Sequence, residues 1–447
     1  MNQFSTGGER LRVCLVTPGQ PSTNPRLVKE ADALTQAGYD VKVVACKYQE
    51  WADEADASFS DRDWSIHWVH YGRMASRPRD LWQRVRRRAS KELVGIMGTQ
   101  SGLTERAFHY AIPELTRRVQ QISADLYIAH NLAALPVADR AAQAHNAALG
   151  FDAEDFHRGE LPDTPENALE RRITSDLEER YIPRCDYVTA ASEGIGNAYA
   201  DTLNVEPPTT ILNVFPWSER EQDVPKTALD SEVPNGKRSL YWFSQTIGPD
   251  RGLEDALRAL PSLPDDVILS LRGQWSPGYE DAFRRQAERL GVADRIWHLD
   301  LVPPDELISR TAQHDVGLAL EPGFSENNKI AISNKLFTYL LSGVPIVATD
   351  TPGQRPVAED LSEVARLYAP GAIEAFSECV AELLASSGLS ERALQVARDR
   401  YCWEEEQSEF LSVVEDVLGT TAGNDRQGSR ENAPKSTESR TESNRVS

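Results

Sequence analysis

The stretch Ser333–Gly353, SNKLFTYLLSGVPIVATDTPG, decides the fold of this chain. An apolar helical segment ends at Gly343, and a short β-branched strand over Pro345–Thr349 follows it and leads into a Pro-Gly turn. This order predicts one helix–strand unit of a parallel sheet. Ser333 is expected to cap the helix, so that the free N–H groups of its first turn form an anion site.

The same alternation of strands and helices recurs on both sides of this unit. The first array has predicted strands at Leu11–Thr17, Tyr39–Cys46, Asp125–Ala129, Leu149–Phe151, Tyr187–Ala191 and Thr210–Val214. The second has them at Ser239–Phe243, Val267–Leu271, Arg295–Leu299, Val316–Leu320 and Pro345–Thr349. Such alternation predicts two Rossmann-like, doubly wound parallel sheets, whose carboxyl ends face a shared cleft.

Changes in composition along the chain divide it into regions. We expect an N-terminal tail over 1–10, a first domain over 11–217, an interdomain segment over 218–238 and a second domain over 239–400. An apolar stripe over 401–419 predicts a helix, and this helix is expected to cross back to the first domain. The polar residues 420–447 are expected to be disordered, because they cannot bury enough apolar surface to fold.

Size, charge and composition exclude several classes of protein. A chain of 447 residues with 40% hydrophobic residues can build two cores, and its net charge of −21 argues against nucleic-acid binding. No apolar run reaches transmembrane length and the N-terminus lacks a signal-peptide core, so a cytoplasmic protein is expected. The five cysteines, His67 and His70 show no metal-ligand spacing, so neither a metal nor a cofactor is expected.

The loop after the first strand of the second array, SQTIGPDRG, is a second candidate anion site. Gly248 and Gly252 allow close backbone approach, and Arg251 places a permanent charge at the start of the next helix. A cation beside a helix N-terminus suits a diphosphate. The alternative is a solvated arginine at a turn.

Several motifs occur together in an order that resembles one family. They are SQTIGPDRGLEDAL, the LRG ending of Val267–Gly273, DVGLALE, SNKLFTYLLSGVPIVA and the terminal Trp-Glu helix. They resemble the retaining glycosyltransferases of the two-Rossmann (GT-B) type often called family 4, over about Leu11 to Leu418. The resemblance implies a nucleotide-diphosphate sugar as donor.

The resemblance also implies roles for residues of the second array. Arg251 matches a basic residue that grips the donor diphosphate, and Gln245 stands where the family often has a second one. The donor-side set is completed by Gly248, by Ser333 with the backbone amides of Asn334 and Lys335, and by Thr338. Two family glutamates, which touch the transferred sugar and the ribose, are replaced here by Ile330 and Thr338. Glu326 or Glu321 is the expected substitute.

In the first array, DLYIAHNLAALPVA resembles the family's strand–AHD–helix unit. His130 would then face the cleft and contact the donor sugar; the alternative is a histidine that satisfies local backbone groups. Gly19 and Asn24 lie in a loop that lines the acceptor side in the family, although Asn24 also suits a helix N-cap. Glu154 and Asp155 are either acceptor contacts or ordinary loop carboxylates.

One region departs from the acidic trend. Between Arg73 and Lys91 there are eight basic residues and one acid, Asp80, interleaved with Leu81, Trp82 and Val85. Some members of the family dock on membranes through such a face to reach lipid-linked acceptors, and an anionic membrane is therefore a candidate partner. The alternative is a solvated helix that offsets the acidic remainder.

These observations predict a hexosyltransferase-like enzyme of cell-surface polysaccharide or glycolipid synthesis. It would transfer a sugar from a nucleotide-diphosphate sugar to a hydroxyl of a glycan or lipid-linked acceptor, and the resemblance implies retention of configuration. Two alternatives stay open: a nucleotide-sugar- or glycan-binding protein without turnover, because both glutamates are absent, and a nucleotide-sugar epimerase on the same architecture.

Overall fold

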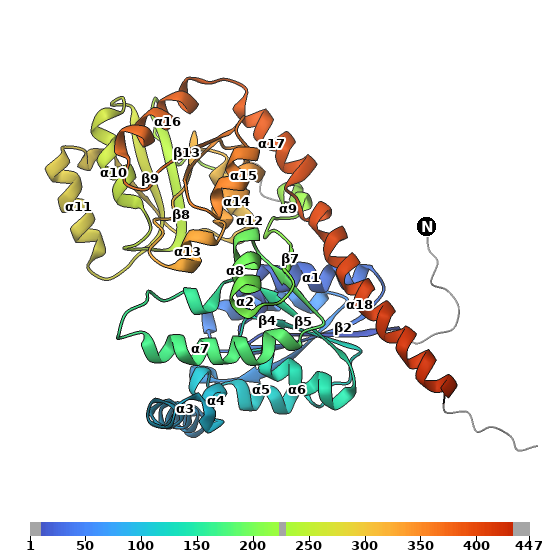
Figure 1. The fold of residues 1–447 in the computed structure, drawn as a ribbon. Helices are drawn as coiled ribbons and strands as arrows, with labels where there is room; N and C mark the ends of the chain where they lie inside the picture. Colours follow the sequence, from blue (N-terminus) through green and yellow to red (C-terminus); the bar gives the residue numbers. More distant parts are fainter. Residues whose placement is uncertain (1–9, 223–228, 432–447) are drawn as a thin grey trace, which may run out of the picture.

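A computed structural model describes residues 10–222 and 229–431, and it shows two α/β domains connected by a long C-terminal helix (Figure 1). One domain is built on a seven-stranded sheet and the other on a six-stranded sheet, and every strand pairing is parallel. The predicted fold class is confirmed. Part of the expected interdomain segment, residues 223–228, and most of the N-terminal tail lie outside the described residues.

The N-terminal sheet has the strand order β3-β2-β1-β4-β5-β6-β7. Its strands are β1 (Arg12–Val16), β2 (Asp40–Lys47), β3 (Ser65–His70), β4 (Leu126–His130), β5 (Ala148–Ala153), β6 (Tyr187–Ala190) and β7 (Thr209–Thr210). The sequence analysis missed β3, an edge strand whose burial is too incomplete to give a clear pattern. It also made β7 too long, because pairing with β6 ends at Thr210.

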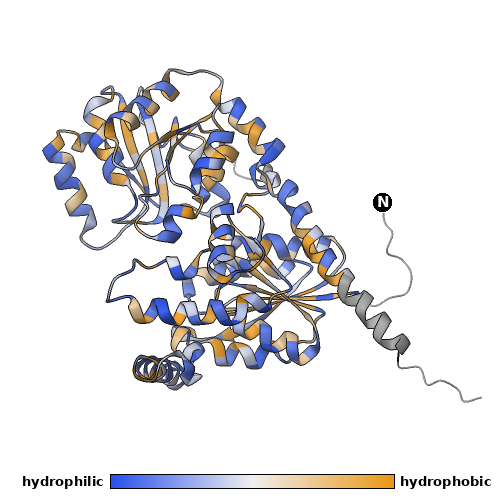
Figure 2. Cartoon of the chain, viewed as in Figure 1, coloured by the Kyte–Doolittle hydropathy of each residue, from blue (hydrophilic) through white to orange (hydrophobic). Residues whose placement is uncertain are grey.

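Helices cover both faces of this sheet, and the apolar sides seen in Figure 2 turn toward the strands. The helices of this domain are α1 (Pro25–Gln36), α2 (Asp53–Ala57), α3 (Arg77–Met97), α4 (Thr104–Phe108), α5 (Ile112–Val119), α6 (Leu135–His145), α7 (Ala168–Tyr181) and α8 (Glu193–Leu203), of which α3 packs on α4 and not on the sheet. The short helix α9 (Trp217–Gln222) begins the link to the second domain. No helix within the described residues is both long and apolar enough to cross a bilayer.

The C-terminal sheet has the order β10-β9-β8-β11-β12-β13. Its strands are β8 (Arg238–Ile247), β9 (Val267–Trp275), β10 (Ile296–Leu299), β11 (Val316–Ala319), β12 (Ile346–Thr349) and β13 (Ala365–Tyr368). The sequence analysis ended β8 at Phe243, but the strand resumes pairing with β9 at Thr246 after an irregularity in register. It also missed β13, a short strand at the edge of the sheet.

The helices of the second domain complete the doubly wound arrangement. They are α10 (Leu253–Ala259), α11 (Tyr279–Leu290), α12 (Pro304–Thr311), α13 (Glu326–Ile330), α14 (Asn334–Ser342), α15 (Gln354–Asp360), α16 (Ile373–Ala385) and α17 (Leu389–Arg400). The opening stretch of the sequence analysis forms α14 and β12, joined at Gly343, whose φ of 72° lies in the left-handed region that glycine tolerates best.

The last helix, α18 (Trp403–Glu431), runs back along the N-terminal domain (Figure 1). Trp403, Phe410 and Val414 are buried in the same apolar cluster as Leu27 of α1. The helix extends to Glu431, into the segment from residue 420 that was expected to be disordered. The rest of that predicted tail, residues 432–447, lies outside the described residues.

Candidate donor site between the domains

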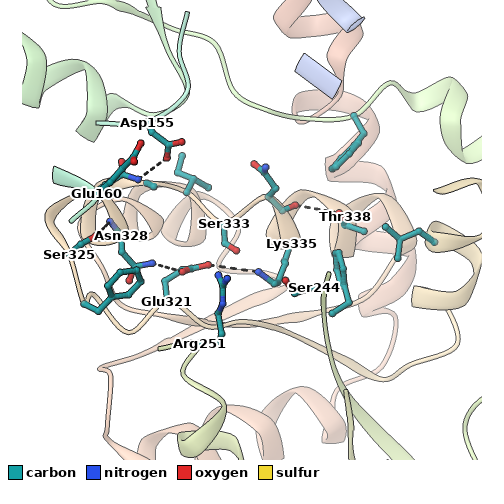
Figure 3. A pocket seen from close by; sticks show the side chains of 18 residues that line it. Asp155, Glu160, Ser244, Arg251, Glu321, Ser325, Asn328, Ser333, Lys335 and Thr338 are labelled. Carbon is teal, nitrogen blue, oxygen red and sulfur yellow. Dashed lines mark hydrogen bonds and ion pairs between the residues drawn. The ribbon is translucent and has the colours of Figure 1, made fainter. Parts of the chain in front are cut away.

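A cavity of about 550 Å³ is lined by residues of both domains (Figure 3). It lies at the carboxyl ends of β8 and β11 and at the N-terminus of α14, where ligands bind in open α/β sheets. The lining residues used below are Asp155, Glu160, Phe215, Phe243, Arg251, Glu321, Phe324, Asn327, Asn328, Ser333, Asn334, Lys335 and Thr338.

The N-terminus of α14 forms one wall of this cavity. Ser333 occupies the N-cap position, but its side chain makes no capping hydrogen bond, which corrects the expectation that it caps the helix. Thr338, one turn along, bonds within the helix to the carbonyl oxygen of Asn334 at 3.3 Å. With no cap on the first turn, the amides of Asn334 and Lys335 remain suited to an anion.

Two cationic side chains line the cavity. Within the described residues Arg251 makes no hydrogen bond or ion pair with another protein group, so its guanidinium is available to a ligand. Lys335 Nζ lies 5.3 Å from the centre of the Trp242 ring and 3.9 Å from Glu321 Oε1. Burial lowers the pKa of Lys335, the charge of Glu321 opposes that shift, and the charge of Arg251 adds to it. The sequence analysis named only the amide of Lys335.

The acidic residue beside these cations is Glu321, not Glu326. Asn328 Nδ2 donates to Glu321 Oε2 at 2.6 Å, and the backbone N–H of Glu321 donates to Thr349 Oγ1 at 2.8 Å. Glu326 is exposed at the start of α13 and does not line the cavity, which corrects its assignment as a donor contact. The chain turns there because Ser325 caps α13, accepting from the N–H of Asn328 at 3.1 Å.

Gln245 and Gly248 also lie outside the cavity lining, contrary to expectation. Because β8 continues to Ile247, Gln245 belongs to the strand and its side chain is exposed. Gly248 is buried against Ser276, whose Oγ would lie 3.0 Å from an added Cβ. Neither residue therefore lines the cavity together with Arg251.

The opposite wall belongs to the N-terminal domain, and Figure 3 shows Asp155 and Glu160 away from Arg251 and Lys335. Asn327 of α13 joins the two domains there, since its Nδ2 donates to Asp155 Oδ1 at 2.7 Å and its Oδ1 accepts from the Phe156 N–H at 2.8 Å. Burial raises the pKa of Asp155. The hydrogen bond from Asn327 therefore fixes a wall of the cavity that spans both domains.

Ile330, which occupies one of the missing family glutamate positions, is part of the same domain contact. Its carbonyl oxygen accepts a hydrogen bond from Ser192 Oγ at 2.8 Å. A Cβ added to Gly194 would lie 3.0 Å from the Ile330 Cβ. This position therefore holds the domains together instead of facing the cavity.

His130 ends β4 as the motif suggests, but its side chain is completely buried and does not line the cavity. Its imidazole nitrogens lie 3.1 Å from Glu30, 3.4 Å from Asp152 and 3.6 Å from Glu154. Burial acts to lower the pKa of His130, but the surrounding carboxylates raise it well above the usual value. The burial corrects the expectation that His130 faces the cleft.

The three buried side chains Glu30, His130 and Asp152 have the composition of a metal site, with ligand atoms within 4.8 Å of one another. Arg26 also enters this cluster, with Nε 2.6 Å from Asp152 Oδ2 and 3.6 Å from Glu30 Oε1. A guanidinium this close already balances the carboxylate charge and would repel a metal ion. We interpret the cluster as a buried charge network.

The three expected acceptor-side residues lie near this network and outside the cavity lining. Asn24 Oδ1 accepts from the Leu27 N–H at 3.1 Å, as an N-cap, while Asn24 Nδ2 donates to Glu154 Oε1 at 2.7 Å. Gly19 packs against Thr23, with Oγ1 3.3 Å from an added Cβ. Asn24 and Glu154 thus serve to fix the first loop, and the carboxylates that line the cavity from this domain are Asp155 and Glu160.

The basic run Arg73–Lys91 lies mostly on α3. Some of its arginines bond to the rest of the domain, and others are exposed. Arg86 donates to Glu114 at 2.7 Å and to the Tyr110 carbonyl oxygen at 2.7 Å, and Arg87 donates to the Phe108 carbonyl oxygen at 3.0 Å. These two arginines attach α3 to the domain. The helix exposes the apolar side chains Leu81, Trp82, Val85, Leu93, Ile96 and Met97, together with Arg77, Arg79, Arg84 and Arg88.

No protein-family model and no curated protein matches this sequence, but solved structures match the fold. Anabaena Alr3699/HepE, solved with UDP and glucose, has a TM-score of 0.61 at 16% identity, and the match covers 91% of this chain and 100% of HepE. Sucrose-phosphate synthase from Thermosynechococcus elongatus has a TM-score of 0.64 at 14% identity, with 92% and 100% covered. WaaG, a glycosyltransferase involved in lipopolysaccharide biosynthesis, has a TM-score of 0.56 at 14% identity, with 91% and 100% covered. The architecture is that of GT-B glycosyltransferases.

Proposed function

We propose that this protein is a glycosyltransferase that uses a nucleotide-diphosphate sugar. The observation that carries the proposal is the grouping of Arg251, Lys335 and the open first turn of α14 on one wall of the interdomain cavity. Two cations and a helix N-terminus match the charge of a diphosphate. The phenyl rings of Phe215 and Phe243 line the same cavity and offer apolar surface for a nucleobase.

The same groups suit the chemistry of transfer. As the bond between the sugar and the diphosphate lengthens, negative charge grows on the leaving diphosphate. Arg251 and Lys335 would stabilise that charge, so we expect transfer to proceed without a metal ion. Glu321, beside Lys335, is positioned to accept hydrogen bonds from hydroxyls of the transferred sugar. The resemblance of the sequence supports retention of configuration.

The matched structures support a choice of first substrates. HepE was solved with UDP and glucose, and WaaG is involved in lipopolysaccharide biosynthesis. We therefore propose a uridine-diphosphate hexose as donor and a glycan or lipid-linked acceptor of cell-surface polysaccharide or glycolipid synthesis.

The decisive experiment incubates the protein with a panel of nucleotide-sugars, with and without simple glycosides as acceptors. Nucleotide release together with a new glycoside supports the transferase. An altered sugar on intact nucleotide identifies an epimerase instead. Absence of nucleotide binding across the panel overturns the proposed donor site.

The second candidate is a nucleotide-sugar-binding protein without turnover. It is favoured by Ile330 and Thr338, which replace the two glutamates of the family that the sequence resembles. Saturable binding of a nucleotide-sugar with neither transfer nor hydrolysis in the panel would support this candidate and exclude the transferase.

We further propose that α3 docks on an anionic membrane at the cytoplasmic face of the cell. The large apolar side chains exposed on α3 include Ile96 at 83% and Trp82 at 61%, and exposed arginines stand among them. A pocket of about 310 Å³ is lined by Arg79 of α3, by Arg117 and Arg118, and by the carboxylate Glu114; its three cations exceed the one anion, which suits phosphate groups.

Vesicle sedimentation tests the membrane proposal. Wild-type protein should bind phosphatidylglycerol vesicles and not phosphatidylcholine vesicles, and Arg77→Glu/Arg84→Glu/Arg88→Glu should abolish binding. The matched control reverses three exposed arginines of α11, Arg284, Arg285 and Arg289. Equal loss in both variants would mean that only overall charge matters. Arg86 and Arg87 are unsuitable for this test because they hold α3 in place.

A further inference from the structure

The N-terminal wall of the cavity carries a carboxylate that neither the sequence analysis nor the comparisons assign. Glu160 lines the cavity, and its side chain is 45% exposed. Glu321, on the other wall, is 16% exposed and lies beside the cation Lys335. The cavity therefore has an inner carboxylate near the diphosphate wall and an outer carboxylate at the more solvent-exposed side.

Glu160 is held by a buried histidine. His157 Nδ1 lies 2.5 Å from Glu160 Oε1, and His157 is 7% exposed. Burial acts to lower the pKa of His157, but the hydrogen bond and the charge of Glu160 raise it to about 9. At neutral pH the His157 ring is therefore an imidazolium. The imidazolium bonds to one oxygen of Glu160, and the second oxygen can accept a hydrogen bond.

Hydrogen bonds to side chains of α7 and α8 fix the loop that carries this pair. The backbone N–H of His157 donates to the Tyr199 hydroxyl at 3.1 Å, and the N–H of Arg158 donates to Glu178 Oε1 at 3.0 Å. The Arg158 guanidinium also pairs with Glu178, which is completely buried. A carboxylate on such a loop keeps its position, which a hydrogen-bonding contact to a ligand requires.

The same loop packs tightly on the second domain. A Cβ added to Gly159 would lie 2.9 Å from Glu326 Cβ and 3.1 Å from the backbone nitrogen of Asn327. Only glycine allows this approach, so the residue before Glu160 sets the distance between the two walls. Glu160 is thus placed relative to Glu321 and Lys335 by direct contact between the domains.

We infer that Glu160 accepts a hydrogen bond from a hydroxyl of the acceptor, and that His157 is the positioning residue that orients it. The inference rests on the proposed function. A carboxylate that is partly exposed, fixed and opposite the diphosphate wall fits a polyhydroxylated acceptor entering from solvent. Glu321 and the two cations would then contact the donor from the C-terminal domain, and Glu160 would contact the acceptor from the N-terminal domain.

The experiment separates donor binding from acceptor binding in the full-length protein. UDP affinity is measured by calorimetry, and UDP release from UDP-glucose is measured with and without octyl β-glucoside. We expect octyl β-glucoside to stimulate release by the wild type, and Glu160→Gln to raise the KM for the glucoside at least tenfold. The UDP Kd, and the rate of UDP release from UDP-glucose without the glucoside, should change less than twofold.

The control variant is Glu179→Gln, which neutralises a carboxylate paired with Arg158 of the same loop but lying outside the cavity lining. It should behave as the wild type. His157→Gln should raise the KM for the glucoside with an unchanged UDP Kd, a split that a general loss of stability would not produce. Equal stimulation of Glu160→Gln and wild type, or no stimulation of the wild type, overturns the inference. Absence of UDP binding by the wild type overturns the proposed function itself.

Discussion

Lys335 Nζ lies 3.9 Å from Glu321 Oε1 on the wall of the interdomain cavity, and Arg251 lines the same cavity. The distance is at the limit of an ion pair, so Lys335 is not tied to the carboxylate by a short hydrogen bond. The Lys335 ammonium can therefore bind a ligand anion, while Glu321 can accept hydrogen bonds from hydroxyl groups of the ligand. Under the proposed function, this arrangement would place the diphosphate of the donor beside the first contact to its sugar.

Removal of the Arg251 guanidinium should weaken donor binding. Charge-assisted hydrogen bonds contribute about 1.5–3 kcal/mol, so Arg251→Ala should raise the UDP Kd about tenfold or more, measured by calorimetry. Arg258→Ala, an exposed arginine on α10 outside the cavity lining, is the control and should bind as the wild type. An unchanged Kd in Arg251→Ala would remove the main donor contact from the site.

As the pH rises, UDP affinity should begin to fall at a lower pH than it would if a lysine with an ordinary pKa bound the diphosphate. Burial and the charge of Arg251 lower the pKa of Lys335, so its ammonium is lost below the usual lysine range. The diphosphate stays ionised above neutral pH, so the loss of the ammonium weakens binding on the alkaline side. Lys335→Arg stays protonated and should flatten the profile. An identical profile in both proteins would exclude Lys335 as the titrating group.

Loss of the Glu321 charge should affect transfer more than nucleotide binding. Glu321→Gln should lower kcat/KM for the donor sugar about tenfold to a hundredfold, the equivalent of one hydrogen bond to a charged group. UDP should bind at least as tightly, because a negative charge beside Lys335 is removed. Glu326→Gln, outside the cavity lining, is the matched control. Equal losses in both variants would contradict the assignment of Glu321.

Chelation of metal ions should leave the reaction unchanged. In the proposed mechanism Arg251, Lys335 and the α14 amides would supply the positive charge that the leaving diphosphate needs, so the transfer rate in EDTA should equal the rate in Mg²⁺ within about twofold. Restoration of lost activity by added Mg²⁺ would show that these groups are insufficient.

An alanine at Gly159 should separate the two walls of the cavity. Its Cβ would lie 2.5 Å from Phe156 Cδ1 as well as against α13, and such overpacking costs roughly 1–3 kcal/mol. We expect a lower melting temperature and weaker transfer. Gly95→Ala, within α3 and with its nearest contact at an ordinary 3.6 Å, should instead stabilise the protein by about 0.5–1 kcal/mol. A melting temperature of Gly159→Ala equal to the wild-type value would contradict the tight contact.

Most strands of the second domain could be predicted from local pattern, whereas β13 and the helices α13, α15 and α17 were not predicted. The helix and strand of Ser333–Gly353 formed as expected because the apolar spacing, the glycine stop and the β-branched run all act within a few residues. The edge strands β3 and β13 escaped prediction because a strand covered on one side only has a weak apolar pattern. Arg251 was identifiable because its neighbours are two glycines in a short loop.

The sequence by itself determined the two parallel sheets, the helix α14 with its N-terminus at Asn334, and the loop that carries Arg251. The tertiary structure decided which side chains face the cavity. It buried His130 among Glu30, Asp152 and Glu154, left Glu326 outside the lining, and brought Glu160 opposite Lys335. The physical reason is the sequence distance between the contacting residues. Secondary structure follows from contacts a few residues apart, whereas the hydrogen bonds that join the two walls of the cavity link residues 171 and 172 positions apart, whose approach depends on how the two domains pack.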